Sequence, residues 1–141
     1  MANLFVEIVS PTGNIFQGEA GGVRAPGVDG SFEVLYDHAA MISAFEVGSI
    51  RITVPSGERI EFATSGGFLE VLNNTVTILA ETAELSSEID IERAREAEEK
   101  ALTSLHSAEE AGAQSRAKED LERARNRVRI AMGSVGKNRP V

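Results

Sequence analysis

The sequence predicts an α+β protein in which an N-terminal antiparallel β-sandwich is followed by a C-terminal antiparallel two-helix hairpin. Apolar residues first recur at every second position between turns rich in glycine and proline, and later at every third or fourth position in alanine-rich segments. A single switch of period at mid-length indicates two unlike modules. We expect a sandwich domain over residues 1–86, a helical hairpin over 87–134 and a flexible tail over 135–141.

Short strands separated by tight turns account for the first module. Turns are expected at Pro11–Asn14, Pro55–Gly57 and Asn73-Asn74, and these separations are too short for crossover helices, which favours an antiparallel sandwich over a βαβ fold. Residues 25–46 mix turn residues with brief apolar pieces, so we expect loops around short strands there. The clearest alternation is at Leu4, Val6 and Ile8, at Ile50, Ile52 and Val54, at Ile60 and Phe62, and at Val76, Ile78 and Ala80.

Two helices are expected in the second module. Asp90 can cap the first helix and Glu92 lies where the helix dipole favours an anion, while Gly112 suits a left-handed C-terminal position and Ser115 can cap the second helix. Alanine seams bury little area, so this hairpin should be only marginally stable by itself. The expected seam consists of Ala94, Ala97, Ala101, Leu105 and Ala108 on the first helix and Ala117, Leu121, Ala124, Val128 and Ala131 on the second.

Composition excludes several classes of protein. The 141 residues are 42% hydrophobic and include no Cys, which removes disulfides, thiolate metal sites and a Cys nucleophile. No apolar run approaches the roughly 20 residues that span a bilayer, and the N-terminus lacks the pattern of a signal peptide. We therefore expect a cytoplasmic protein.

The net charge of −8 is unevenly distributed. Residues 1–87 contain 11 acidic and 3 basic residues, residues 88–110 contain 8 and 3, and residues 116–139 contain 3 and 8. Binding to nucleic acid requires a cationic face, so we expect no nucleic-acid partner for the acidic segments. The basic segment can engage an acidic surface.

No group of residues predicts catalysis or a metal site. His38 and His106 lie far apart without a carboxylate at ligand spacing; His106 is read as a solvated helix residue, whereas His38 either orders its loop or contacts a partner. The segment Ser65–Phe68 lacks the Gly-Lys-Ser/Thr ending of a phosphate loop, so we expect a glycine turn or bulge where strands approach closely. The chain is not expected to be a catalyst by itself.

The strongest anion-binding signal is the basic run Arg123, Arg125, Arg127 and Arg129. Arg123 and Arg127 are i, i+4 neighbours on one helix face, and paired guanidinium groups suit phosphate or carboxylate. The alternative is a solvated helix that balances its acidic neighbour.

The chain resembles the ε subunit of bacterial F-type ATP synthases. The resemblance covers nearly the whole chain and is most specific at Ser65–Val71, Val76–Ala80 and Ile89–Ala94, followed by the arginine-rich second helix. It implies a non-catalytic rotor subunit of a proton-translocating ATP synthase, at the foot of the central stalk on the cytoplasmic face of the bacterial inner membrane. It implies contacts with the γ subunit and the c-ring, and helices that either fold down or extend towards the α and β subunits and inhibit ATP hydrolysis.

The resemblance also implies candidate sites, but no required cofactor. Lys100 stands where nucleotide-binding members have Arg, which keeps the charge without the planar fork. Around His38, the residues Glu33–Ala40 replace the family's Gly-x-x-Pro-Gly-His-x-Pro. The candidate regulatory ATP site consists of Glu84, Ile89, Asp90, Arg93, Ala94, Lys100, Arg123 and Arg127; Ser31, Tyr36, Asp37, His38 and Met41 are candidate contacts of γ or the c-ring, and Arg125 and Arg129 of the β subunit.

A second reading stays open at this point. The chain can instead be a free-standing cytoplasmic module that senses nucleotide with its helical arm. A stalk subunit should co-purify with γ, whereas a sensor should remain alone and bind ATP.

Overall fold

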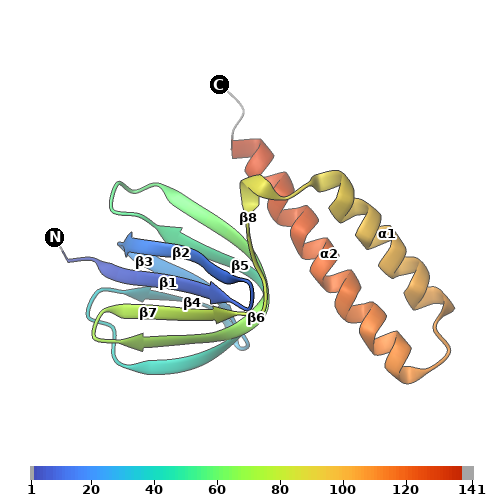
Figure 1. The fold of residues 1–141 in the computed structure, drawn as a ribbon, viewed down its shortest axis with the longest axis horizontal. Coiled ribbons are helices and arrows are strands. Elements are labelled where there is room, and N and C mark those ends of the chain that lie inside the picture. The colour runs from blue at the N-terminus through green and yellow to red at the C-terminus, as the bar shows by residue number, and fades with distance from the viewer. Residues whose placement is uncertain (1, 138–141) are drawn as a thin grey trace. The chain divides into compact units, whose positions relative to one another are not determined.

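The structure is a computed structural model that describes residues 2–137, in which strands come first and helices follow (Figure 1). The chain divides between Leu85 and Ser86 into two compact units. Unit 1 is built from strands and unit 2 from helices, which confirms the predicted fold class.

Within the described residues, unit 1 forms one eight-stranded sheet. The strands are β1 (Leu4–Ser10), β2 (Gly13–Ala20), β3 (Gly22–Gly27), β4 (Gly30–Leu35), β5 (Met41–Thr53), β6 (Arg59–Leu72), β7 (Thr75–Ala80) and β8 (Ala83–Leu85). Their order in the sheet is β2-β1-β7-β6-β5-β3-β4, and β8 pairs with β6. Neighbours are antiparallel except β1 and β7, which are parallel.

The two long strands β5 and β6 allow this sheet to enclose a core. In β6 the core-facing positions change from even numbers, at Phe62, to odd numbers, at Leu69 and Val71. Such a change of phase needs an irregularity, which also bends the strand. Gly66 and Gly67 supply it with φ values of 124° and 155°.

The glycine pair also marks a close approach between strands. A Cβ atom on Gly67 would lie 2.0 Å from the carbonyl oxygen of Leu79 on β7, so no other residue fits without displacing that strand. The prediction that the Ser65–Phe68 segment brings strands close together is confirmed. The segment lies within β6, and no turn interrupts the strand there.

The core of unit 1 is mainly aliphatic. The rings of Phe16 and Phe62 add an edge-to-face contact with centroids 6.0 Å apart. The largest side chains with less than 2% exposure are Leu4, Ile8, Ile50, Ile52, Leu69 and Ile78.

Residues 25–46 contain short strands joined by loops, as expected, but the strands fill more of the segment than the sequence suggested. β3, β4 and the start of β5 occupy that segment, and Tyr36–Ala40 is the main part left outside strands. Gly27 and Gly30 pair across the β3–β4 turn, where a Cβ atom on Gly27 would lie 2.6 Å from the carbonyl oxygen of Gly30. Glycines required by this close approach interrupt the apolar alternation, and that hid the full extent of the strands.

Unit 2 contains η1 (Ser86–Glu88), a 3-10 helix, and the helices α1 (Ile91–Ser107) and α2 (Ala111–Lys137). The predicted cap is confirmed because the side chain of Asp90 accepts a hydrogen bond from the backbone N–H of Arg93 at 3.2 Å. A connection of residues 108–110 makes α1 and α2 antiparallel neighbours.

Three details of the predicted hairpin were wrong. Gly112 and Ser115 lie inside α2 and do not mark its boundary with α1. A side chain caps the end of α1 in place of a glycine. The amide Nε2 of Gln114 donates a hydrogen bond to the carbonyl oxygen of the C-cap residue Ala108 at 3.0 Å. Ala97 is exposed because the seam continues from Ala94 to Ala101 through the half-buried Glu98.

The second helix continues into the predicted tail. α2 includes residues up to Lys137, and the rest of that tail, residues 138–141, lies outside the described residues. The seam on α2 is otherwise as expected, with Ala117, Leu121, Ala124 and Ala131 buried.

Candidate interaction sites in the two units

The candidate loop of unit 1 is only partly assembled as the sequence suggested. Tyr36, Asp37 and His38 lie together in the β4–β5 loop, and Met41 follows at the start of β5. Ser31 lies four positions before the end of β4, about 13 Å along the strand from Leu35, so it is not part of this loop. The ring Nδ1 of His38 lies 2.8 Å from the carbonyl oxygen of Ala39, which orders the loop locally.

An apolar outer face of the sheet was missed by the sequence reasoning. Cross-strand partners point to the same side of a sheet, and Phe68 lies opposite Leu79, while Leu72 and Phe5 both pair with Thr75. The signal was present in the run Phe68–Leu72, which is apolar on both faces of the strand. We define the apolar face by its exposed members Phe5 (38%), Ile42 (76%), Phe68 (59%), Leu72 (50%) and Leu79 (55%).

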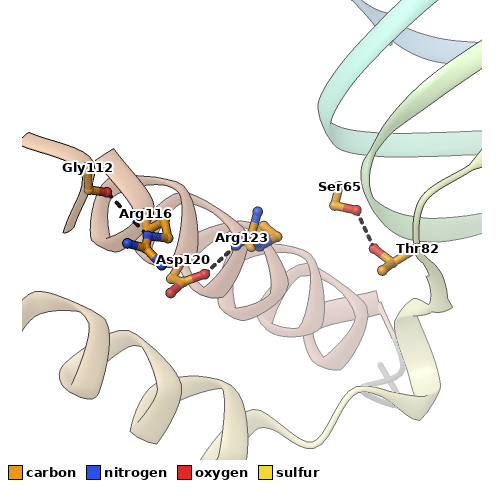
Figure 2. A network of polar contacts seen from close by, with 6 residues as sticks. All are labelled: Ser65, Thr82, Gly112, Arg116, Asp120 and Arg123. Carbon is orange, nitrogen blue, oxygen red and sulfur yellow. Dashed lines mark hydrogen bonds and ion pairs between the residues drawn. The ribbon is translucent and has the colours of Figure 1, made fainter. Parts of the chain in front are cut away.

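A small hydroxyl cluster stabilises the point where β6 leaves β7 and pairs with β8. The hydroxyl of Thr82 donates to that of Ser65 at 2.7 Å, as Figure 2 shows, and the hydroxyl of Thr64 donates to the carbonyl oxygen of Thr82 at 2.8 Å. These bonds satisfy groups within the sheet, which agrees with a structural role and not a phosphate loop.

The candidate ATP residues are divided between the units. Glu84 lies in β8 of unit 1, and the other seven lie in unit 2. Ile89 and Ala94 are buried, so they contribute packing, whereas Asp90 is used as the cap of α1. Arg93 and Lys100 are exposed and share a face of α1 because they are two helical turns apart.

An ion pair between α1 and α2 identifies which residues of the two helices lie side by side. Nε of Arg125 lies 3.5 Å from Oε1 of Glu98, and both side chains are partly exposed. Lys100 lies two residues after Glu98 in α1, and Arg123 lies two residues before Arg125 in α2. Because the helices are antiparallel, Lys100 and Arg123 lie at the same level along the hairpin. Arg123 and Arg127 share one face of α2, as their i, i+4 spacing predicted.

The arginines of α2 already have polar neighbours. Arg123 forms an ion pair with Asp120 one turn earlier, and Arg116 donates to the carbonyl oxygen of Gly112 at 3.4 Å (Figure 2). Arg129 donates to the side-chain oxygen of the buried Asn126 at 2.7 Å. Any anion that binds Arg123 must therefore displace Asp120 or share the guanidinium group with it.

Neither a metal site nor a membrane span is found in the part of the chain that the structure describes. No three His, Asp or Glu residues among residues 2–137 are grouped to hold a metal ion. Neither described helix is sufficiently long and apolar to cross a bilayer.

Comparison with known families agrees with this architecture. The family model described as the ATP synthase delta/epsilon chain, beta-sandwich domain, matches residues 3–86, and the model of its long alpha-helix domain matches residues 87–132. The chain belongs to the ATP synthase delta/epsilon family. The resemblance seen in the sequence is thereby confirmed.

Individual delta/epsilon-family relatives are similar over almost their full length. The ATP synthase epsilon chain of Salinibacter ruber is 52% identical, with 94% of this chain and 95% of the relative covered. That of Halalkalibacterium halodurans is 39% identical, with 93% and 98% covered. In fold, the chain is similar to a chain in a structure of the Euglena gracilis mitochondrial ATP synthase OSCP, F1 and c-ring, with a TM-score of 0.80, 20% identity, and 96% and 82% covered.

Proposed function

We propose that this delta/epsilon-family chain is the epsilon subunit in the central stalk of a proton-translocating F-type ATP synthase. In this role it couples rotation of the c-ring to the catalytic head and inhibits ATP hydrolysis through its movable C-terminal helices. It acts as a component of the complex and not as an enzyme by itself. It works on the cytoplasmic face of the bacterial inner membrane and meets the membrane only through the complex.

The observation that carries this proposal is the weak closure of the hairpin in unit 2. Ala94, Ala101, Ala117, Ala124 and Ala131 form most of the buried seam, and each buries little more than one methyl group, about 0.8 kcal/mol. Leu121 and Ile130 are the two large aliphatic side chains that the described part of α2 buries, and each contributes roughly 1.5–3 kcal/mol. The Glu98–Arg125 pair is partly exposed, and ion pairs near the surface contribute about 0–1 kcal/mol. A hairpin held this weakly can open at modest cost, so a partner or ligand can shift its population.

The apolar face supports a stalk position for unit 1. Contiguous exposed apolar side chains mark protein contacts, and this face also carries the carboxylates of Glu7 and Glu70. We assign it to the γ subunit, because a partner with apolar and basic side chains would cover it. The neighbouring β4–β5 loop, with Tyr36 and His38, is assigned to the c-ring.

Unit 2 carries the proposed regulatory contacts. The cationic groups of Arg93, Lys100, Arg123 and Arg127 supply the charge that the phosphates of ATP require, and bound ATP would stabilise the closed hairpin. In the extended state, Arg125 and Arg129 would be released to contact acidic groups of the β subunit.

The test measures ATP hydrolysis by a complex rebuilt with variants of the chain. Removing residues 86–141 should raise hydrolysis severalfold because the inhibitory element is gone. Glu98→Gln should lower it by up to about fivefold, because loss of the ion pair favours the open hairpin while the proposed β contacts stay intact. Glu99→Gln removes the same charge one position away and should change little.

Opposite effects of the truncation and of Glu98→Gln would distinguish a movable inhibitor from a passive spacer. Equal hydrolysis with the full and the truncated chain, with and without ATP in the preincubation, would contradict the inhibitory role. Failure to co-purify with γ would favour the free-standing sensor instead.

A further inference from the structure

One side chain in unit 1 connects two segments that lie 37 residues apart in the sequence. The side-chain oxygen Oδ1 of Asn74 accepts a hydrogen bond from the backbone N–H of Asp37 at 2.7 Å, and its Nδ2 donates to the Asp37 carboxylate at 3.4 Å. The backbone oxygen of Asn74 accepts from the N–H of Phe5 at 2.9 Å. The β6–β7 turn thereby holds the β4–β5 loop and the first strand together.

Both members of this pair have a backbone conformation that most residues avoid. Asp37 has a φ of 65° and Asn74 a φ of 60°. The left-handed region costs roughly 1–2 kcal/mol for ordinary residues, and Asn and Asp tolerate it because their short side chains form local hydrogen bonds. The bonds between Asp37 and Asn74 therefore stabilise a conformation that the loop would not adopt readily by itself.

The loop has little else to fix its shape. Residues 36–40 contain neither proline nor glycine, and two local hydrogen bonds involve His38: its N–H donates to the carbonyl oxygen of Leu35 at 3.2 Å, and its ring contacts the carbonyl oxygen of Ala39. The loop nevertheless presents Tyr36 with 45% of its surface exposed. Flexible loops lose conformational entropy on binding. The two hydrogen bonds between Asp37 and Asn74, which we call the clasp, order this loop before it binds and so favour recognition.

The position of the clasp agrees with an interface role. Leu72 lies two residues before Asn74, and Phe5 donates its backbone N–H to Asn74, so two members of the apolar face border the turn. The loop is thus held at one end of that face. A partner that covers the apolar face can reach the loop without crossing the core of the sheet.

We propose that Asn74 is a positioning residue that holds the Tyr36–Ala40 loop in the conformation in which it contacts the c-ring. The inference rests on the proposed role of this loop as a rotor contact. Asn74 acts through Asp37 and need not touch the partner.

The experiment compares variants at the two residues of the β6–β7 turn. Asn74→Gly keeps the positive φ and removes only the side chain, whereas Asn73→Gly makes the same change at the neighbouring residue (φ 48°), whose side chain is not part of the clasp. Hydrogen exchange at the Asp37 amide should accelerate about tenfold or more in Asn74→Gly and stay unchanged in Asn73→Gly. Affinity for a γ–c-ring subcomplex should fall by about three- to tenfold in Asn74→Gly alone.

A reciprocal exchange separates positioning from general damage. Asn74→Asp alone places two carboxylates together and should release the loop. Combined with Asp37→Asn, the new carboxylate can accept from both the backbone N–H and the side-chain amide at position 37, so exchange protection and affinity should return.

Each outcome either supports or contradicts the proposed role of Asn74. Unchanged exchange at Asp37 in Asn74→Gly, or no recovery in the double variant, would overturn the proposal. If Tyr36→Ala and His38→Ala weaken binding but Asn74→Gly does not, the positioning role fails and the loop contact stands. If Tyr36→Ala and His38→Ala bind normally, the loop is not the rotor contact and both ideas fail.

Discussion

The two units differ most in the side chains that hold each of them together. Unit 1 buries Leu, Ile and Val from six strands, and each large aliphatic side chain contributes roughly 1.5–3 kcal/mol when removed from water. Unit 2 buries five alanines but only three large aliphatic side chains among its described residues, namely Ile89, Leu121 and Ile130. The difference in side-chain size agrees with the proposal that unit 1 keeps its shape while the hairpin of unit 2 opens.

The largest expected effect is on the free energy of unfolding of unit 1. Gly67→Ala would force a methyl group against the backbone of Leu79 at a φ of 155°, which should destabilise unit 1 by about 3 kcal/mol or more. Gly112→Ala is the matched change in unit 2. The added Cβ atom would meet no atom of another part of the chain within 4 Å, so the substitution should stabilise α2 by about 0.4–1 kcal/mol. Urea denaturation of both variants measures these changes; a tolerated Gly67→Ala would show that β6 and β7 are less constrained than described.

A smaller effect is expected at the seam of the hairpin. Leu121→Ala should lower the free energy of unfolding of unit 2 by about 2 kcal/mol and leave the transition of unit 1 unchanged. Leu102→Ala on the exposed side of α1 should change it by less than about 0.5 kcal/mol. Helical circular dichroism and near-ultraviolet signals followed on heating report the two units separately. A joint shift of both transitions would mean that the units unfold as one.

The smallest effect concerns the charges on the hairpin. Arg123→Ala with Arg127→Ala should weaken ATP binding by up to about tenfold, because partly exposed charge pairs contribute about 0–1 kcal/mol each. Asp120→Asn should strengthen it by up to about fivefold, since the phosphate no longer competes with a carboxylate for Arg123. Glu119→Gln removes one charge without touching that pair and is the control in titration calorimetry. Equal affinities in all four chains would remove Arg123 and Arg127 from any ATP site.

Much of the fold could be predicted because periodicity reflects burial directly. Alternation at Leu4–Ile8 and Val76–Ala80 predicted strands, and the spacing of Ala117, Leu121 and Ala124 predicted the second seam. The predictions were incomplete or wrong where a local contact overrides the pattern. Gly27 and Gly30 serve a turn that interrupts the alternation, and Gln114 satisfies the end of α1 in place of a glycine cap.

The candidate sites were less predictable because sites depend on contacts between distant residues. The spacing of Arg123 and Arg127 identified a shared helix face. It did not show that Arg123 already forms an ion pair with Asp120. His38 was singled out, whereas Asn74 was predicted only as a turn residue. Its hydrogen bond to Asp37 spans 37 residues and has no local signal. The run Phe68–Leu72 gives a local signal of the apolar face, but the members of that face are brought together only when β6 and β7 are placed in register and Phe68 pairs with Leu79.

The parallel pairing of β1 with β7 has a consequence for how the protein is made. Phe5 pairs with Thr75, so the first strand cannot pair with β7, its second neighbour in the sheet, until nearly all of unit 1 has left the ribosome. Contacts this distant in sequence slow folding to roughly milliseconds or longer, whereas the local contacts of a helical pair form in about microseconds. Until β7 emerges, β1 and β2 form an isolated two-stranded ribbon, and their apolar side chains are open to chaperones or to the same ribbon of another nascent chain.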